Sequence, residues 1–118
     1  PRLPPASRRP RCAALIALGM MRAGSFAKEC AKALTDDNYE VRLCAIECLS
    51  GMGDDGRKCS NDISGCLEDE NFYVRMKACE CIGTLKAEDA MLNLPDRFED
   101  SSPSVRAAAL YAVMESSE

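Results

Sequence analysis

The residues of this chain that could do chemistry are its eight cysteines and the nineteen carboxylates of its aspartates and glutamates. The chain contains no histidine. Without histidine it lacks the usual general base near neutral pH and the usual mixed zinc sites. No two cysteines form a C-x-x-C pair; they are Cys12, Cys30, Cys44, Cys48, Cys59, Cys66, Cys79 and Cys81. We expect them to be reduced, buried core residues. A disulfide framework, a redox role and a metal site are the alternatives that stay open.

Two segments match the residue pattern of a cofactor or metal motif but lack the structural context that the motif requires. Residues 51–56 read G-x-G-x-x-G, but the stretch before them has the periodicity of a helix, and a dinucleotide fold needs a strand there. Residues 36–40 resemble the start of a calcium loop, yet Val41 stands where that loop requires glycine. The other carboxylates cluster where turns are expected. We therefore expect no cofactor, no metal and no enzymatic activity.

One pattern occurs four times, centred on arginines that are 31, 33 and 31 residues apart: Arg11, Arg42, Arg75 and Arg106. Three residues after each arginine comes an alanine, and four residues later comes a leucine, isoleucine or valine. Self-similarity at this period is typical of a solenoid, in which each unit buries its apolar face against its neighbours. Such a chain is more often a surface for protein partners than a catalyst.

Each copy predicts an amphipathic helix with a polar residue at its start. After Asn38, apolar side chains at positions 41, 45, 48, 49 and 52 follow one helical face. The expected N-caps stand four residues before each arginine: Ser7, Asn38, Asn71 and Ser102. Shorter apolar-periodic segments near residues 25–34, 57–67 and 87–98 predict partner helices, and Pro95 should interrupt the last of them.

Three corner segments carry a family resemblance. Residues 34–36, 67–69 and 98–100 read LTD, LED and FED, and each aspartate precedes a repeat arginine by six residues. This pattern resembles the HEAT-repeat superfamily, particularly the short HEAT-like repeats also found in phycobilin lyases. The resemblance implies an all-α, right-handed α-solenoid of about seven helices, or three and a half helix pairs. It also implies a structural ladder along the stack, made of Asp36, Arg42, Asp69, Arg75, Asp100 and Arg106. The first copy departs from the pattern, because Pro5 stands at the aspartate position.

The chain divides into a short arm and one repeat domain. A basic arm rich in proline and arginine covers residues 1–9, and the repeat domain covers residues 10–118. The expected units are residues 10–38, 39–71 and 72–102, with a final helix over 103–116. Residues 1–35 carry a net charge of +6, whereas residues 36–118 carry −10. This asymmetry indicates a polarised partner surface or end-to-end docking.

The function that we expect is a non-catalytic scaffold for protein–protein interaction, either an accessory subunit of a larger assembly or a fragment of a longer repeat array. Residues 12–21 and 107–114 are apolar almost all round, and terminal repeats of a free solenoid need a polar outer face. We therefore expect other protein subunits to cover both ends. One alternative is a lyase-like chaperone that holds a chromophore or client polypeptide. Another is electrostatic binding of nucleic acid through the basic arm.

The candidate partner-facing residues lie on an outer stripe of the capped helices and in the arm. Leu43 and Met76 are apolar residues on a face that the helical wheel predicts to be solvated, which suggests contact with a partner. The full candidate set is Leu43, Glu47, Met76, Glu80, Tyr111, Arg2, Arg8 and Arg9. Glu47, Glu80 and Tyr111 are also the only candidates for the placed acid that a lyase would need.

The cysteines and the absence of a glycosylation sequon predict an intracellular reducing compartment: the cytosol, the nucleus or an organelle matrix such as the plastid stroma. Residues 8–25 could alternatively be a signal peptide, but their apolar positions keep the register of the repeats. Because the first residue is Pro1, we expect a processed product or a fragment. No stretch reaches the length of a membrane span, so attachment to a membrane complex would be peripheral. No small-molecule substrate is expected.

Overall fold

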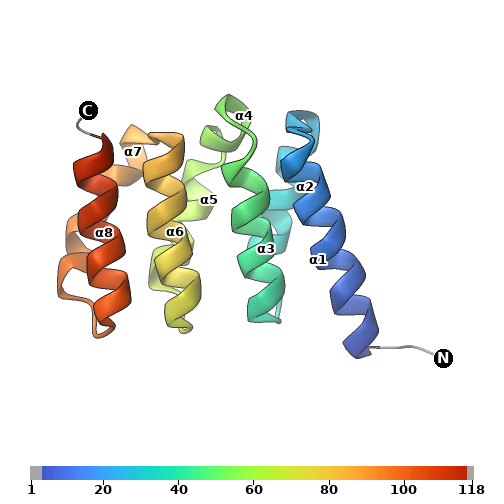
Figure 1. Cartoon of the computed structure of the whole chain (residues 1–118), viewed down its shortest axis with the longest axis horizontal. Helices are drawn as coiled ribbons and strands as arrows, with labels where there is room; N and C mark the ends of the chain where they lie inside the picture. Colours follow the sequence, from blue (N-terminus) through green and yellow to red (C-terminus); the bar gives the residue numbers. More distant parts are fainter. Residues whose placement is uncertain (1–3, 117–118) are drawn as a thin grey trace.

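A computed structural model describes the backbone of residues 4–116 and the side chains of residues 11–115. The described part is an all-α solenoid whose helices form two rows (Figure 1). The long helices stand side by side in one row: α1 (Pro4–Met20), α3 (Tyr39–Ser50), α6 (Phe72–Leu85) and α8 (Pro103–Ser116). The predicted fold class is confirmed.

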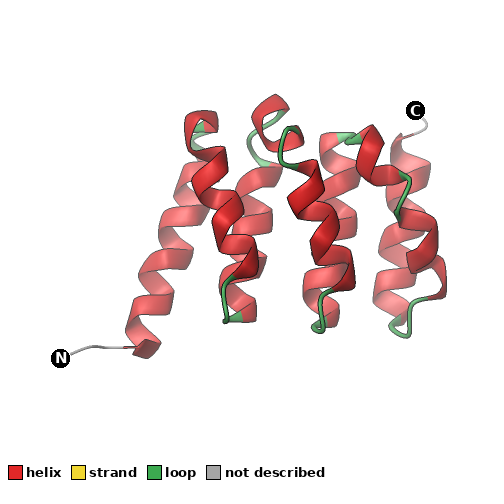
Figure 2. Cartoon of the chain, turned by 180° about the vertical axis from the view of Figure 1, so that it is seen from behind, coloured by secondary structure: helices red, strands yellow, loops and turns green. Residues whose placement is uncertain are grey.

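The second row, seen from behind in Figure 2, consists of short helical pieces. After α1 come η1 (Gly24–Phe26), α2 (Ala27–Lys32) and η2 (Ala33–Thr35); after α3 come α4 (Asp54–Arg57), α5 (Ser60–Gly65) and η3 (Cys66–Glu68); after α6 come α7 (Glu88–Met91) and η4 (Leu94–Glu99). The sequence predicted about seven helices, and the structure divides each of the three partner segments into shorter helical pieces. Pro95 lies in the first turn of η4, at the break that its missing N–H predicts.

The first helix begins earlier than the sequence indicated. Its backbone is helical from Pro4, so most of the predicted arm over residues 1–9 belongs to α1. Ser7 consequently lies inside the helix and does not cap it, and this cap prediction is wrong. Prolines are tolerated in the first turn of a helix, where no intrahelical N–H bond is needed, and Pro4 and Pro5 occupy that turn.

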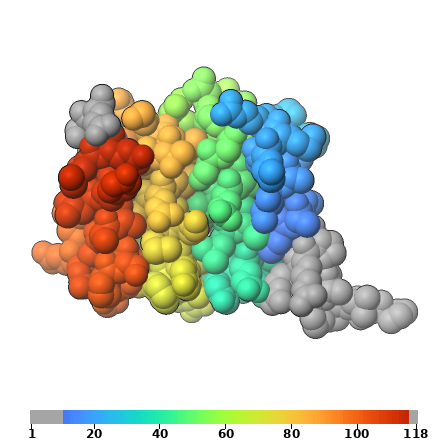
Figure 3. All heavy atoms as spheres, in the orientation of Figure 1, coloured from blue at the N-terminus to red at the C-terminus, as the bar shows by residue number. Residues whose placement is uncertain are grey.

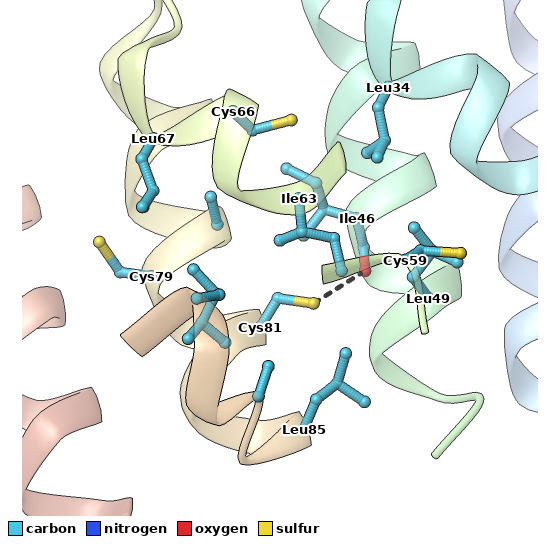
Figure 4. Close-up of a cluster of buried hydrophobic side chains, with 14 of the residues drawn as sticks. Leu34, Ile46, Leu49, Cys59, Ile63, Cys66, Leu67, Cys79, Cys81 and Leu85 are labelled. Atoms are coloured by element: carbon cyan, nitrogen blue, oxygen red, sulfur yellow. Dashed lines mark hydrogen bonds between the residues drawn. The ribbon is translucent and has the colours of Figure 1, made fainter. Parts of the chain in front are cut away.

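The core lies between the two rows and is built from aliphatic and cysteine side chains. Ile46, Leu49, Ile63 and Ile82 are at most 1% exposed. Figure 4 shows several cysteines in this cluster, where the Cys81 thiol donates to the Ile46 carbonyl oxygen at 3.8 Å. All eight cysteines are free thiols, and six are buried. The expectation that all eight are buried is wrong for Cys12 and Cys44, which are half-buried because they lie at the edge between α1 and α3.

Close packing of α1 and α3 explains the glycine-rich motif. A Cβ atom on Gly51 would lie 2.5 Å from the carbonyl oxygen of Gly19, so only glycine fits at that contact. Two residues later, Gly53 has a φ of +57°, which turns the chain out of α3 toward α4. The G-x-G-x-x-G pattern therefore reflects the close contact between α1 and α3 and the turn that follows α3. These residues form no nucleotide-binding loop.

Candidate interaction site

Arginine–aspartate pairs link successive long helices. Arg42 of α3 donates from Nε and Nη2 to both carboxylate oxygens of Asp69, at 2.8 and 3.1 Å. Arg75 of α6 makes the same two-pronged contact with Asp100, at 2.9 and 3.0 Å. Each arginine also donates from Nη1 to the carbonyl oxygens of its own corner. One guanidinium therefore fixes its own turn and the next repeat together, through charge-assisted bonds.

The pairing differs in detail from the sequence-based ladder. The spacing favours a pair between Asp69, near the end of one unit, and Arg75, near the start of the next. Instead the Asp69 side chain binds Arg42 of its own unit, and Arg75 donates to the Asp69 backbone carbonyl oxygen. Although Pro5 leaves the first unit without its aspartate, Arg11 still takes part: its Nη2 lies 3.6 Å from Asp36 Oδ2. This pair is longer and more exposed than the two inner pairs.

The aspartates also hold the helix starts. Each ladder carboxylate accepts the backbone N–H of the cap residue two positions later, namely Asn38, Asn71 or Ser102. The Asn38 and Asn71 side chains in turn accept first-turn N–H groups of α3 and α6, and the Ser102 hydroxyl accepts that of Val105 at 3.4 Å. The ladder therefore determines where α3, α6 and α8 begin as well as how neighbouring helices stack.

Asp100 is the most enclosed ladder carboxylate, with a side chain only 3% exposed. Burial by itself would raise the pKa of Asp100. Hydrogen bonds from Arg75 and from the Ser102 N–H, together with the charges of Arg75 and Arg97, outweigh burial and hold the pKa of Asp100 below its ordinary value. The folded protein thus stabilises the ionised form of the Asp100 carboxyl group.

This depressed pKa predicts an acid-dependent loss of stability. A carboxyl whose pKa is lower in the folded state contributes stability above its unfolded pKa of about 3.9, and the contribution disappears as the pH falls through the folded value. We expect Asp100→Asn to reduce the free energy of unfolding at pH 7, measured with urea, and the difference from the unaltered chain to shrink below about pH 4. The exposed Glu99→Gln should show little difference at either pH. If the difference in the free energy of unfolding between Asp100→Asn and the unaltered chain stayed constant in acid, this assignment would be contradicted.

The ladder ends at Arg106 of α8 with one edge open. Its Nη1 donates to the Asp100 carbonyl oxygen at 2.6 Å, as in the other repeats. On its Nε and Nη2 edge, no carboxylate of residues 11–115 pairs with it. The side chain is accordingly exposed.

The apolar side of α8 next to Arg106 is also uncovered. Leu110 occupies the repeat position of Ile46 and Cys79, yet it is 51% exposed while they are 1% and 0% exposed. Tyr111 and Met114 beside it are 66% and 59% exposed. We call Arg106, Leu110, Val113 and Met114 the α8 face; it lies at the red end of the stack in Figure 3. Sequence reasoning noted an apolar helix here but missed Leu110 and Met114 as individual residues.

The predicted outer stripe is not the solvated surface that the helical wheel indicated. Leu43 and Met76 are half-buried and pack against the core, so their assignment to a solvated face is wrong. Glu47 and Glu80 are exposed, and both approach Lys77 Nζ, at 3.7 and 3.5 Å. Tyr111 is exposed as well, next to the α8 face. Arg2, Arg8 and Arg9 lie outside the residues whose side chains the structure describes.

One hollow of the surface, of about 740 Å³, lies between α2 and α5 and is lined by Lys28, Lys32 and Lys58 among other residues. Glu47 and Glu80 line none of the described hollows, so the acid that a lyase would need is not placed in one. Among the described residues, no group of cysteines and carboxylates could hold a metal ion, and no helix is long and apolar enough to cross a membrane.

Comparison with known families identifies these repeats. A HEAT-repeat model matches residues 28–55, and a second model, of HEAT repeats, matches residues 62–118. The chain is a HEAT-repeat protein. The two matches cover α2 to α3 and α5 to the end of the chain, and the Arg42–Asp69 pair joins the two matched regions. HEAT repeats generally serve as protein-interaction scaffolds and are typically non-catalytic. No curated protein matches the chain.

Proposed function

We propose that this HEAT-repeat protein is a non-catalytic scaffold that binds another protein through the α8 face. The observation that carries the proposal is the open edge of Arg106. In α3 and α6 the equivalent arginine uses that edge to bind the carboxylate at the corner before the next long helix. A planar guanidinium edge suits a carboxylate, because two parallel N–H···O bonds form at once. The partner therefore presents an aspartate or glutamate at this position.

The burial pattern supports the same face. The inner counterparts of Leu110 are fully covered by the following helix, and the counterparts of Val113, which are Leu49 and Ile82, are 0% exposed. A contiguous apolar surface of this kind beside an unpaired charge is typical of a protein-binding site. The face is apolar in its middle and charged at its rim, as interface hot spots usually are.

Met114 limits what the partner can be. Its counterparts in the three earlier units are Gly19, Ser50 and Gly83, all of them small. At Gly83 an added Cβ would lie 2.9 Å from the Ala112 Cβ, so the next helix approaches closely there. A methionine in α8 does not permit that approach. The partner helix must stand away from α8 near Met114 while it contacts Arg106 and Leu110, and another unit of the same type would not stack here unchanged.

The opposite end offers a second, weaker surface. Ile16, Met20 and Met21 of α1 and its following turn are 39%, 80% and 72% exposed. If this protein is an accessory subunit enclosed at both ends, or part of a longer array, its neighbours would cover both surfaces. A reducing intracellular compartment remains our proposal for its location, supported by eight free thiols.

Affinity purification of the tagged full-length protein from its native cells tests the proposal. Two variants change the α8 face, Arg106→Ala and Leu110→Glu, and Leu92→Glu is the matched control because Leu92 is 82% exposed elsewhere. We expect quantitative mass spectrometry to show that both α8 variants lose specific partners on the order of tenfold, whereas the control retains them. Equal recovery with all three variants, each shown to be folded by circular dichroism, would disprove the assignment of this face.

A further inference from the structure

Two cysteines meet at the boundary between the first two repeats. Cys12 lies on α1, and its thiol donates to the carbonyl oxygen of Glu40 on α3 at 3.6 Å. Glu40 stands one helical turn before Cys44 on the same helix. In an α-helix the carbonyl oxygen of Glu40 faces the backbone N–H of Cys44, so this contact places the Cys12 sulfur beside Cys44. The helices are close enough for this because a Cβ on Gly19 would lie only 2.8 Å from the Cα of Cys48.

The same two cysteines are the ones that solvent can reach. Cys12 and Cys44 are half-buried, whereas the other six cysteines are buried. Reactivity toward oxidants follows access to the sulfur as well as its ionisation. Cys30 and Cys48 are a second pair of neighbouring cysteines, but both residues are 0% exposed. The chain thus holds one accessible pair and one enclosed pair of the same type.

We propose that Cys12 and Cys44 are a site of oxidative modification at which hydrogen peroxide forms a disulfide that fastens α1 to α3. The Cys12 thiolate attacks peroxide: an S–O bond forms, the O–O bond breaks, and the departing hydroxide takes a proton to become water. The Cys44 sulfur then attacks the sulfenic sulfur of Cys12. The S–S bond forms, the S–O bond breaks, and the second hydroxide leaves as water with the Cys44 proton. Two thiols are oxidised and one peroxide is reduced to two waters.

The order of the two roles follows from the surroundings of Cys44. Burial, the neighbouring Cys12 and the carboxylates of Glu47 and Glu40 raise the pKa of Cys44 to about 12. Cys44 therefore stays a thiol near neutral pH and does not make the first attack. In the second step Cys44 loses its proton to the departing hydroxide as its sulfur attacks the sulfenic sulfur of Cys12.

The disulfide would act on the least enclosed helix of the stack. α1 packs mainly against α3, and Ala13, Ile16 and Ala17 on its other side are exposed. A bond from Cys12 to Cys44 closes a loop of roughly 30 residues, which restricts the unfolded chain and opposes separation of α1. Oxidation would thereby hold the first repeat in its docked position.

Peptide mapping of the reduced full-length chain after treatment with hydrogen peroxide tests this site. We expect mass spectrometry without reductant to find the Cys12–Cys44 linked peptide as the main product. It should disappear in Cys12→Ser and in Cys44→Ser and persist in Cys30→Ser. The oxidised protein should melt a few degrees higher, and dithiothreitol should reverse the shift.

The unaltered chain alone can overturn the proposal, even if Cys30→Ser fails to fold. Cys30–Cys48 linked peptides that form as fast as the Cys12–Cys44 peptide would contradict the distinction between accessible and enclosed pairs. Sulfinic acid on Cys12 without any cross-link would show that Cys44 does not resolve it. Eight unmodified thiols after treatment would show that there is no such site.

Discussion

Replacing Asp100 with alanine is expected to lower the free energy of unfolding by about 3–5 kcal/mol, a large fraction of the stability of a domain this size. The substitution leaves Arg75 without its carboxylate in a place where the arginine side chain is only 13% exposed. It also removes the acceptor of the Ser102 N–H and the partner of Arg97. Chemical denaturation followed by circular dichroism measures the loss.

A double-mutant cycle separates the ladder contact from general damage. Arg75→Ala combined with Asp100→Ala should cost clearly less than the sum of the two single changes, because each single change already breaks the same pair. Arg75→Ala combined with Asp69→Ala is the control, since the Asp69 side chain binds Arg42. We expect a coupling near zero in the control. If the losses in the free energy of unfolding were additive for Arg75 and Asp100, the ladder contact would not stabilise the stack.

Replacing Gly51 with alanine is expected to cost about 1–3 kcal/mol, although the new side chain is a single methyl group. Gly51 has a φ of −86°, which alanine adopts without strain, so the cost comes from space alone. The methyl would meet backbone atoms of Gly19, which cannot rotate away as a side chain could. We expect α1 to be pushed off α3, and hydrogen exchange across α1 should accelerate along with the loss of stability.

Gly65→Ala provides the matched control, because a Cβ at that position meets nothing within 4 Å. Alanine is the better helix former, so this change should be neutral or stabilising by up to about 1 kcal/mol. The same loss at both positions would mean that helix contact is not the reason for glycine at position 51.

Most of the fold could be predicted from the repeat pattern, because each unit makes the same local contacts. Period, caps and corner aspartates all depend on residues close together in the chain, and the α-solenoid follows from them. The spacing favoured Arg75, six residues ahead, as the partner of Asp69, and this prediction is wrong because the Asp69 side chain binds Arg42, 27 residues away. Choosing between them needs the rotation of one unit relative to the next.

The candidate site was harder to predict for a related reason. A helical wheel assigned Leu43 and Met76 to solvent, yet both pack against the core because each long helix contacts neighbours on several sides. Leu110 has the same repeat position as the buried Ile46, so its sequence pattern is that of a core residue. Only the arrangement of the helices shows that nothing in the described chain covers it.

Site-specific photo-crosslinking in native cells shows whether a partner protein occupies the α8 face. A photoreactive phenylalanine analogue at position 110 should crosslink to a partner protein, and the crosslink should weaken strongly when Arg106 is also replaced by alanine. The same analogue at position 92, equally apolar and more exposed, should give no comparable product. Crosslinks from position 92 with none from position 110 would show that the protein binds elsewhere and that the α8 face is not its docking site.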